Sequence, residues 1–246
     1  MYHWAGHQYG VDKLNIEDSY PLTIGEFQIQ VIKSGAPWNE NCYLVSHLQS
    51  GEQAVIDPGG NAEYIIQAIL AKGGRLRYLW LTHAHFDHVS AVAALCRRFD
   101  VICKLHKNDL RLLRQAPMYA LRFSGKQIET PAPFQVYDFP CQFQFGGQSV
   151  SVISTPGHTL GSVCYALNGF IFTGDTLLYE MIGRTDMPGG EKITLINSVD
   201  HLVKSLPKDT IIFPGHGRLW SIAGAQVWWG KSRNDPPDLR KFEEGY

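Results

Sequence analysis

The chain has 246 residues, of which 44% are hydrophobic and 18% charged, and its formal net charge is −1 at pH 7. This length and apolar content predict one α/β domain over residues 1–246 with an ample buried core. Basic residues are not clustered as in nucleic-acid-binding proteins, and no window approaches the roughly 18 apolar residues of a membrane span. We therefore expect neither nucleic acid nor a membrane as partner.

The first half of the chain alternates apolar runs with helical patterns. Residues 1–25 are rich in aromatic residues and His and are predicted to form an N-terminal arm, packed on the domain or on a partner subunit. Alternating or continuous apolar residues predict strands at 27–31, 42–46, 53–56, 78–81 and 101–105. Apolar residues at helical spacing predict helices at 61–72, from the segment after Leu81 to Arg98, and at 108–122.

The second half repeats the strand pattern. Residues 123–141 are rich in proline and are predicted to be a loop, and Asn168-Gly169 between two apolar runs is a strong hairpin signal. Residues 231–246 are half charged and are predicted to be an exposed polar tail. Further strands are expected at 150–153, 163–167, 170–172 and 211–213, and a helix at 193–206. Two β-rich halves with helices predict a four-layer αββα sandwich.

The five cysteines form no CxxC pair and are odd in number. They are predicted to be small buried hydrophobic residues of a reducing compartment rather than a disulfide framework. The N-terminus lacks a basic segment followed by an apolar stretch, so no signal peptide is predicted. We therefore expect a cytoplasmic protein.

Four metal-binding side chains lie within six positions of the segment THAHFDH, namely His83, His85, Asp87 and His88. Imidazole nitrogens and carboxylates are natural ligands of zinc and similar metals. Three His this close together would repel once protonated, whereas a bound cation stabilises them. For Asp87, the role of an ordinary helix N-cap remains open.

Three further candidate ligands follow apolar runs later in the chain. His158 lies in TPGHT, Asp175 in FTGD and His216 in PGHG. Catalytic groups are commonly held on loops positioned by a rigid scaffold. These residues are therefore expected to complete the metal site.

The order and context of these motifs resemble the metallo-β-lactamase-fold hydrolases over about residues 25 to 225. The stretches NCYLV at 41–45 and VIDPG at 55–59 also look like this family. Residues 182–190, IGRTDMPGG, resemble its glyoxalase II-like branch and the persulfide dioxygenases. The resemblance implies the αββα metallo-β-lactamase fold, with the metal site at one edge of the sheets, between the two halves.

The resemblance also implies a role for each ligand. His83, His85 and His158 would form one metal site, Asp87, His88 and His216 a second, and Asp175 would lie between the metals. The implied cofactors are two divalent metal ions, zinc first, with iron or manganese as alternatives. Two such cations lower the pKa of a shared water, so that hydroxide attacks a carbonyl carbon. Asp175 and Asp87 are the catalytic candidates, and Asp87 either manages a proton or serves as a ligand only.

Three functions remain open. The first is hydrolysis of a thioester or related acyl ester, a small-molecule substrate, by a monomer or homodimer, with lactone hydrolysis as a close variant. The second is a mononuclear iron persulfide dioxygenase, with iron on His83, His158 and Asp175. Such enzymes usually carry AHDY near the last His, whereas this chain has PGHG, which favours two metals. The third, a non-catalytic member of the fold, is disfavoured by the intact ligands.

The C-terminal region departs from glyoxalase II proper, which carries a helical domain whose basic residues hold glutathione. Only thirty residues, 217–246, follow His216 here, so glutathione is not implied. Short glyoxalase II-like members often continue PGHG with PxTxxGxE, whereas this chain continues RLWSIAGAQ. Trp220, Trp228 and Trp229 either line an apolar pocket or pack the last helix on the core. Trp220 and Tyr179 are the substrate-binding candidates, with core packing as the rival role of each.

Other polar residues near these motifs have two possible roles. Asp57 either orients a ligand His or stabilises the Asp-Pro-Gly turn, and Thr82 and Thr159 either support neighbouring ligands or shape turns. Arg184 and Asp186 either form a buried ion pair that stiffens the loop after Asp175 or contact substrate. Arg122 and Lys126 hold an acidic substrate or belong to the solvated surface.

Overall fold

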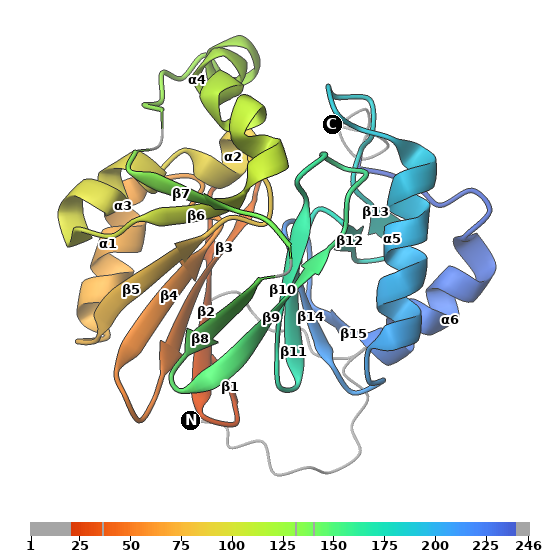
Figure 1. Ribbon diagram of the computed structural model, residues 1–246, viewed down its shortest axis with the longest axis horizontal. Coiled ribbons are helices and arrows are strands. Elements are labelled where there is room, and N and C mark those ends of the chain that lie inside the picture. The colour runs from red at the N-terminus through yellow and green to blue at the C-terminus, as the bar shows by residue number, and fades with distance from the viewer. Residues whose placement is uncertain (1–20, 36, 131, 140, 240–246) are drawn as a thin grey trace.

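The computed structural model describes residues 21–239 except residues 36, 131 and 140. Two β-sheets face each other, and helices cover the outer face of each (Figure 1). The predicted four-layer αββα sandwich is therefore confirmed. No helix in the described part of the chain has the length and apolar character to cross a membrane.

The first sheet has seven strands in sequence order. They are β1 (Leu22–Ile24), β2 (Phe27–Lys33), β3 (Asn41–His47), β4 (Glu52–Ile56), β5 (Arg75–Trp80), β6 (Cys103–His106) and β7 (Phe134–Tyr137). From β4 onward the pairs are parallel, so helices make the crossovers. These helices are α1 (Ala62–Ala71), α2 (Phe86–Val89), α3 (Val92–Phe99), the 3₁₀ turn η2 (Lys107–Asp109) and α4 (Leu110–Ser124).

The second sheet has six strands in the order β15-β14-β11-β10-β9-β8. They are β8 (Gln142–Phe145), β9 (Gln148–Ser154), β10 (Val163–Leu167), β11 (Phe170–Gly174), β14 (Ile211–Pro214) and β15 (Trp220–Ser221). The outer helices α5 (Lys192–Ser205) and α6 (Ile222–Ser232) cover it, and β12 (Leu177–Leu178) pairs with β13 (Met181–Ile182) in a separate hairpin. The predicted hairpin at Asn168-Gly169 joins β10 to β11.

Strand β3 lies between two of the three apolar cores that separate the four layers of the sandwich. All seven of its residues are buried, because both faces of its sheet are covered. Successive side chains of a strand point to opposite faces. Accordingly, Cys42 and Leu44 pack with the outer helices, whereas Tyr43 and Val45 enter the core between the sheets.

Aromatic side chains hold the two sheets together. Trp80 of β5 stacks on Tyr165 of β10 with ring centroids 5.4 Å apart, and Tyr43 of β3 meets Phe213 of β14 edge-to-face at 5.5 Å. Such pairs contribute about 0.5–1.5 kcal/mol beyond the burial of their area. The relative position of the two halves is therefore defined by specific ring contacts.

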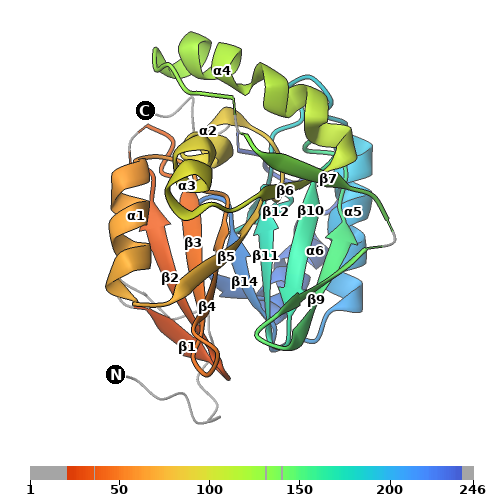
Figure 2. The same ribbon diagram turned by 60° about the vertical axis from the view of Figure 1, so that its left-hand side comes forward.

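Strand direction brings distant turns to one end of the second sheet. β9 and β11 are both antiparallel to β10, and β11 is parallel to β14. The carboxyl ends of β9, β11 and β14 therefore lie at the same end of the second sheet. Figure 2 shows α2 and α4 at the same end of the molecule as the carboxyl ends of these strands.

Three sequence predictions about elements are corrected. Residues 134–137, expected within a loop, form β7, because β6 offers a free edge for parallel pairing. Residues 22–24 of the expected arm form β1 on β2, while residues 1–20 lie outside the described part of the chain. The single helix expected before Arg98 is two helices, α2 and α3.

The expected exposed tail is also corrected. Residues 231 and 232 end α6, and residues 237–239 pair with the β12–β13 hairpin. Ile182 donates its N–H to the Pro237 carbonyl at 2.9 Å, and Leu239 donates to the Ile182 carbonyl at 3.0 Å. The side chain of Asp238 is buried. This segment is held because it supplies backbone partners for a hairpin edge. The described cysteines are free, and four of the five are buried, as predicted.

Candidate metal centre

The segment THAHFDH begins directly after β5 and delivers its side chains from a strand end and a short helix. His83 and His85 lie on extended backbone and share one side, with ring centroids 4.8 Å apart. His85 is the N-cap of α2, and Asp87 lies in the first turn of that helix. The N-cap role considered for Asp87 is therefore excluded, and its carboxylate is available to the site.

One group of ligand atoms contains only imidazole nitrogens. His158 Nε2 lies 3.2 Å from His83 Nε2 and 2.8 Å from His85 Nδ1. All three side chains are buried. The turn after β9 thus brings His158 onto the two His that follow β5, as the sequence predicted.

A second group combines two imidazoles and a carboxylate. His88 Nε2 lies 3.3 Å from His216 Nε2, and Asp87 Oδ2 lies 3.8 Å from His88 Nε2 and 3.5 Å from His216 Nε2. Here the turn after β14 supplies the residue from the second half.

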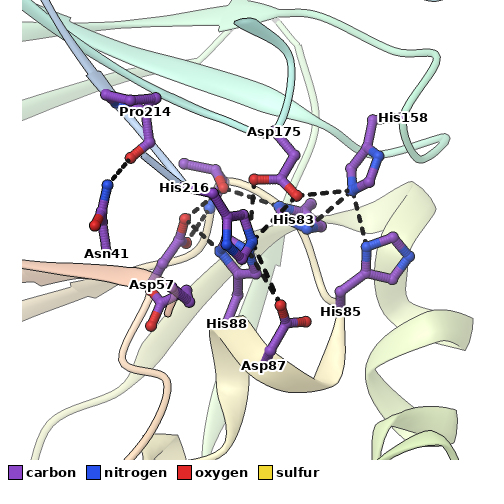
Figure 3. Close-up of polar contacts among 12 residues, drawn as sticks. Asn41, Asp57, His83, His85, Asp87, His88, His158, Asp175, Pro214 and His216 are labelled. Carbon is purple, nitrogen blue, oxygen red and sulfur yellow. Dashed lines mark hydrogen bonds and ion pairs between the residues drawn. The ribbon is translucent and has the colours of Figure 1, made fainter. Parts of the chain in front are cut away.

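Asp175 lies between the two groups (Figure 3). Its Oδ1 is 3.6 Å from His88 Nε2, and its Oδ2 is 3.6 Å from His158 Nε2 and 3.5 Å from His216 Nε2. Oδ1 is buried without a hydrogen-bond partner among the described residues. A buried carboxylate oxygen without a donor is costly, and a cation between the two groups would satisfy it.

The donor set fits two divalent cations. Imidazole nitrogens facing one another at hydrogen-bonding distance, together with buried carboxylates, are the ligand chemistry of zinc and iron sites. Asp57 also lies close to His83 and His88. Both of its oxygens, however, are already used in hydrogen bonds to protein groups, so it is not part of the donor set.

Of the two roles considered for Asp57, its side chain performs the first, the support of a ligand. Its Oδ1 accepts from the Thr82 N–H at 2.7 Å, and its Oδ2 accepts from the Thr82 hydroxyl at 2.6 Å. Oδ2 also lies 3.1 Å from His88 Nδ1. The backbone φ of Asp57 is 49°, a left-handed conformation in which Asp is enriched. The Asp57 carboxylate therefore orients a ligand, and its hydrogen bonds go to Thr82 and His88 rather than to the Asp-Pro-Gly turn.

Backbone carbonyls orient two further ligands. His158 Nδ1 lies 2.7 Å from the Arg184 carbonyl, and His216 Nδ1 lies 2.9 Å from the Trp38 carbonyl. A partner on one ring nitrogen sets the tautomer and turns the other nitrogen inward. In both residues Nε2 therefore faces the centre.

Asp109 was not singled out by sequence reasoning, although it connects the two halves at the site. This buried carboxylate accepts from the Ala84 N–H at 3.0 Å, between His83 and His85 in sequence. It also accepts from the Gly161 N–H at 2.7 Å and the Thr159 hydroxyl at 2.9 Å. Its position just past β6, at the carboxyl end of a parallel strand, was the available signal.

A second connection runs through Asn41 and Tyr43 of β3. Asn41 Nδ2 donates to the Pro214 carbonyl at 2.9 Å and to the Gly217 carbonyl at 3.0 Å (Figure 3). The Tyr43 hydroxyl donates to the Pro214 carbonyl at 2.5 Å. The turn that carries His216 is therefore attached to the first sheet on both sides of this ligand.

Burial and charge favour metal-binding protonation states in the all-imidazole group and in Asp175. Burial lowers the pKa of His85 to about 3, and burial together with the charge of His88 lowers the pKa of His83. For Asp175, burial alone would raise the pKa, but the charges of His216 and His88 outweigh it and lower the pKa. Neutral imidazoles and an ionised carboxylate are the forms that bind cations. In the other group, burial alone would lower the pKa of His88, but the charges of Asp175 and Asp87 outweigh it and raise that pKa, so a cation there would displace a proton.

A cavity of about 1260 Å³ opens onto the ligands. Its apolar wall residues are Trp38, Phe86, Phe123, Met181, Met187, Pro237 and Leu239. Tyr179, a substrate-binding candidate, lines it together with Arg184 and Arg218. The Arg184 guanidinium is held by both carboxylate oxygens of Asp186, at 2.8 and 2.9 Å. The predicted ion pair therefore forms, but it is exposed to solvent and not buried. Arg122 and Lys126 are not part of this lining.

The role expected for Trp220 is corrected. Its side chain is 2% exposed and packs beneath Tyr179, with ring centroids 5.3 Å apart. Trp229 is buried as well, and Trp228 packs against Trp220. The Trp-rich segment therefore joins α6 to the core, and of the two substrate-binding candidates only Tyr179 reaches the cavity.

Comparison with known proteins places the chain in a family. The model of the metallo-beta-lactamase superfamily matches residues 35–216. A hydroxyacylglutathione hydrolase GloC from Haemophilus influenzae is 36% identical over 194 residues, which are 75% of this chain and 89% of the relative. The crystal structure of BLEG-1 B3 metallo-beta-lactamase superposes with a TM-score of 0.75 and 33% identity, covering 81% of this chain and 96% of that one. TTHA1623 in a di-iron-bound form gives 0.70 and 34%, covering 79% and 95%. The chain therefore belongs to the metallo-β-lactamase superfamily and carries a candidate metal-binding cluster of His and Asp residues.

Proposed function

We propose that the protein is a dinuclear metallohydrolase that cleaves an acyl thioester or a related ester. The observation that carries this proposal is the position of Asp175. Its two oxygens face both ligand groups, and one of them lacks a partner among the described residues. A carboxylate between two sets of ligands is the arrangement that holds a pair of cations.

The residues of the site have distinct proposed roles. His83, His85 and His158 would hold one cation, Asp87, His88 and His216 the other, and Asp175 both. When bound, two divalent cations lower the pKa of a water and stabilise negative charge on a carbonyl oxygen. Asp87 lines the cavity and its side chain is 13% exposed, so it is placed to carry a proton between water and leaving group.

The cavity supports an acyl substrate with an apolar part. Aromatic and methionine side chains form much of its wall, and such surfaces bind acyl chains by burial of apolar area. Three observations make a thioester the first choice: these walls, the superfamily and the relative named as a hydroxyacylglutathione hydrolase.

Glutathione thioesters stay in the test panel. The sequence motifs predict poor turnover of such substrates. The Haemophilus relative is matched over 89% of its own chain, so little of it is left for an added domain. The name and the length of this relative together keep lactoylglutathione as a candidate substrate.

Metal analysis and a substrate panel test the proposal. Purified protein should bind close to two equivalents of zinc, iron or manganese, and the di-iron form of TTHA1623 makes iron a required arm. We expect higher kcat/KM for acyl or aromatic thioesters than for lactones or lactoylglutathione. A single tightly held iron with oxygen uptake on a persulfide would contradict the proposal and support the dioxygenase. A preference for lactoylglutathione would change the substrate and leave the metal chemistry standing.

A further inference from the structure

One wall of the metal cavity carries a cation stacked on an aromatic ring. The Arg218 guanidinium carbon lies 3.6 Å from the ring centroid of Tyr179. Tyr179 lies in the turn between β12 and β13 and packs on the buried Trp220. The ring beneath the guanidinium is therefore itself supported by the core. Stacking on this ring orders the Arg218 side chain, which would otherwise rotate freely.

The backbone of Arg218 is also held on both sides. The Gly217 carbonyl before it accepts from Asn41 Nδ2 at 3.0 Å and from Lys33 Nζ at 3.3 Å. After it, Trp220 pairs with Ile212 in the second sheet. A binding group on a rigid segment loses little entropy when a ligand arrives.

The two guanidinium groups in the cavity wall differ in their ion pairs. The guanidinium of Arg184 is paired with Asp186. Arg218 forms no ion pair with a carboxylate within residues 21–239. Stacking on Tyr179 uses the face of the guanidinium, whereas its N–H donors lie along the edge. The edge is therefore available for an anion with two adjacent oxygens, which it can bind through two parallel hydrogen bonds.

We propose that Arg218 binds an anionic group of the substrate, a carboxylate or a phosphate, and selects thioesters that carry one. This inference rests on the proposed function and names its substrate class. Arg218 follows the ligand His216 by two residues, so their Cα atoms are at most about 7 Å apart. Both residues line the same cavity, so the anionic group and the carbonyl that is attacked would occupy that one cavity. The apolar wall covers the rest of the molecule.

Matched substrate pairs test this role with the metal-loaded, full-length protein. The first pair places the charge in the acyl part: glutaryl-N-acetylcysteamine against its terminal methyl ester. The second places a carboxylate in the thiol: butyryl-3-mercaptopropionate against its methyl ester. The third places a phosphate there: butyryl-pantetheine 4′-phosphate against butyryl-pantetheine. The quantity compared is the ratio of kcat/KM within a pair, so a general loss of activity cancels.

The wild type should prefer the charged member of at least one pair by roughly 10- to 100-fold. Arg218→Met should bring that ratio close to one, and Arg218→Lys should retain part of it, because it keeps the charge and loses the planar fork. Arg111→Met is the matched control, since Arg111 is an exposed residue of α4 outside this cavity, and its ratio should equal that of the wild type.

Binding supplies a readout that does not depend on turnover. Calorimetry with thioether analogues, in which CH₂ replaces the attacked carbonyl, should show the same loss of preference in Arg218→Met. Equal ratios in wild type and Arg218→Met would overturn the inference, as would a wild type that hydrolyses thioesters without regard to charge. If no thioester is hydrolysed but the charged analogue still requires Arg218, the anion site stands and the proposed reaction falls. If both measurements fail, both proposals fall.

Discussion

The two halves of the sandwich contribute to the metal centre in opposite ways. The first half supplies four candidate ligands from one segment of six residues, His83 to His88. The second half supplies three, each from a different turn after β9, β11 or β14. Each ligand group nevertheless needs one His from the second half, His158 or His216.

This difference shows that a compact motif does not make a site by itself. Local backbone geometry places the first four side chains, but the nitrogens that complete each group arrive only when the two sheets pack. Asp109 and Asn41 connect the halves directly at this point. Metal binding and the packing of the sandwich should therefore be thermodynamically coupled, because a ligand set that exists only in the folded state adds its binding energy to stability.

The largest effect is expected at Asp175, the residue of the second half that faces both ligand groups. Asp175→Ala should lower the content of both metals and abolish measurable turnover, a greater loss than the roughly 10- to 100-fold seen when only an outer partner of a ligand is removed. Circular dichroism should show a folded sandwich, because the aromatic core between the sheets is untouched. Metal analysis on the same sample provides the check, and full activity with unchanged metal would refute the bridging role.

Removing a single His of the second half should separate the two groups. His158→Ala should empty the all-imidazole group and His216→Ala the group that contains Asp87, each leaving about one equivalent of metal. Both variants should lose most hydrolysis, because the reaction uses the pair. If His216→Ala kept full activity while His158→Ala had none, a mononuclear centre would replace the dinuclear one.

The connection between the halves is tested at Asp109. Asp109→Asn keeps the shape of the side chain but places an amide N–H₂ against protein donors at Ala84, Gly161 or Thr159. We expect a loss of roughly 10- to 100-fold in metal affinity or activity. Asp138→Asn, the same change at an exposed carboxylate, is the control and should behave as wild type. A metal affinity equal to that of wild type in Asp109→Asn would show that the sheets align the ligands without this residue.

The smallest effect is expected in a part of the second half that carries no ligand. Glu191 caps α5, and its carboxylate accepts from the N–H groups of Ile193 at 3.1 Å and Thr194 at 2.5 Å. The hydrogen bonds to Thr194 and Ile193 lower its pKa from the ordinary value of 4.5. Its contribution to stability is therefore present above pH 4.5 and is lost as the pH falls through the lowered pKa. Glu191→Ala should lower the Tm slightly at pH 7, by an amount that shrinks toward pH 3, with metal content unchanged. A Tm difference that grows on acidification would contradict this role.

Much of the site follows from residue types and spacing. Histidines and a carboxylate within six positions, and single ligands just after apolar runs, indicate metal chemistry without coordinates, because few other environments stabilise such a set. The hairpin at Asn168-Gly169 and the alternation of β2 likewise follow from local conformational preferences. These features depend on residues that are close in sequence.

Only the tertiary structure decided which surfaces meet. The pairing of β7 with β6, the attachment of residues 237–239 to Ile182, the burial of Trp220 beneath Tyr179, and the position of Asp109 between Ala84 and Gly161 all join residues far apart in the chain. Apolar periodicity marks a side chain as buried but does not name its partner. The sequence by itself thus indicated the candidate ligands and the layered class of fold, whereas the packing of two sheets determined the cavity, its wall and the stacking of Arg218 on Tyr179, because those depend on long-range contacts that no local pattern encodes.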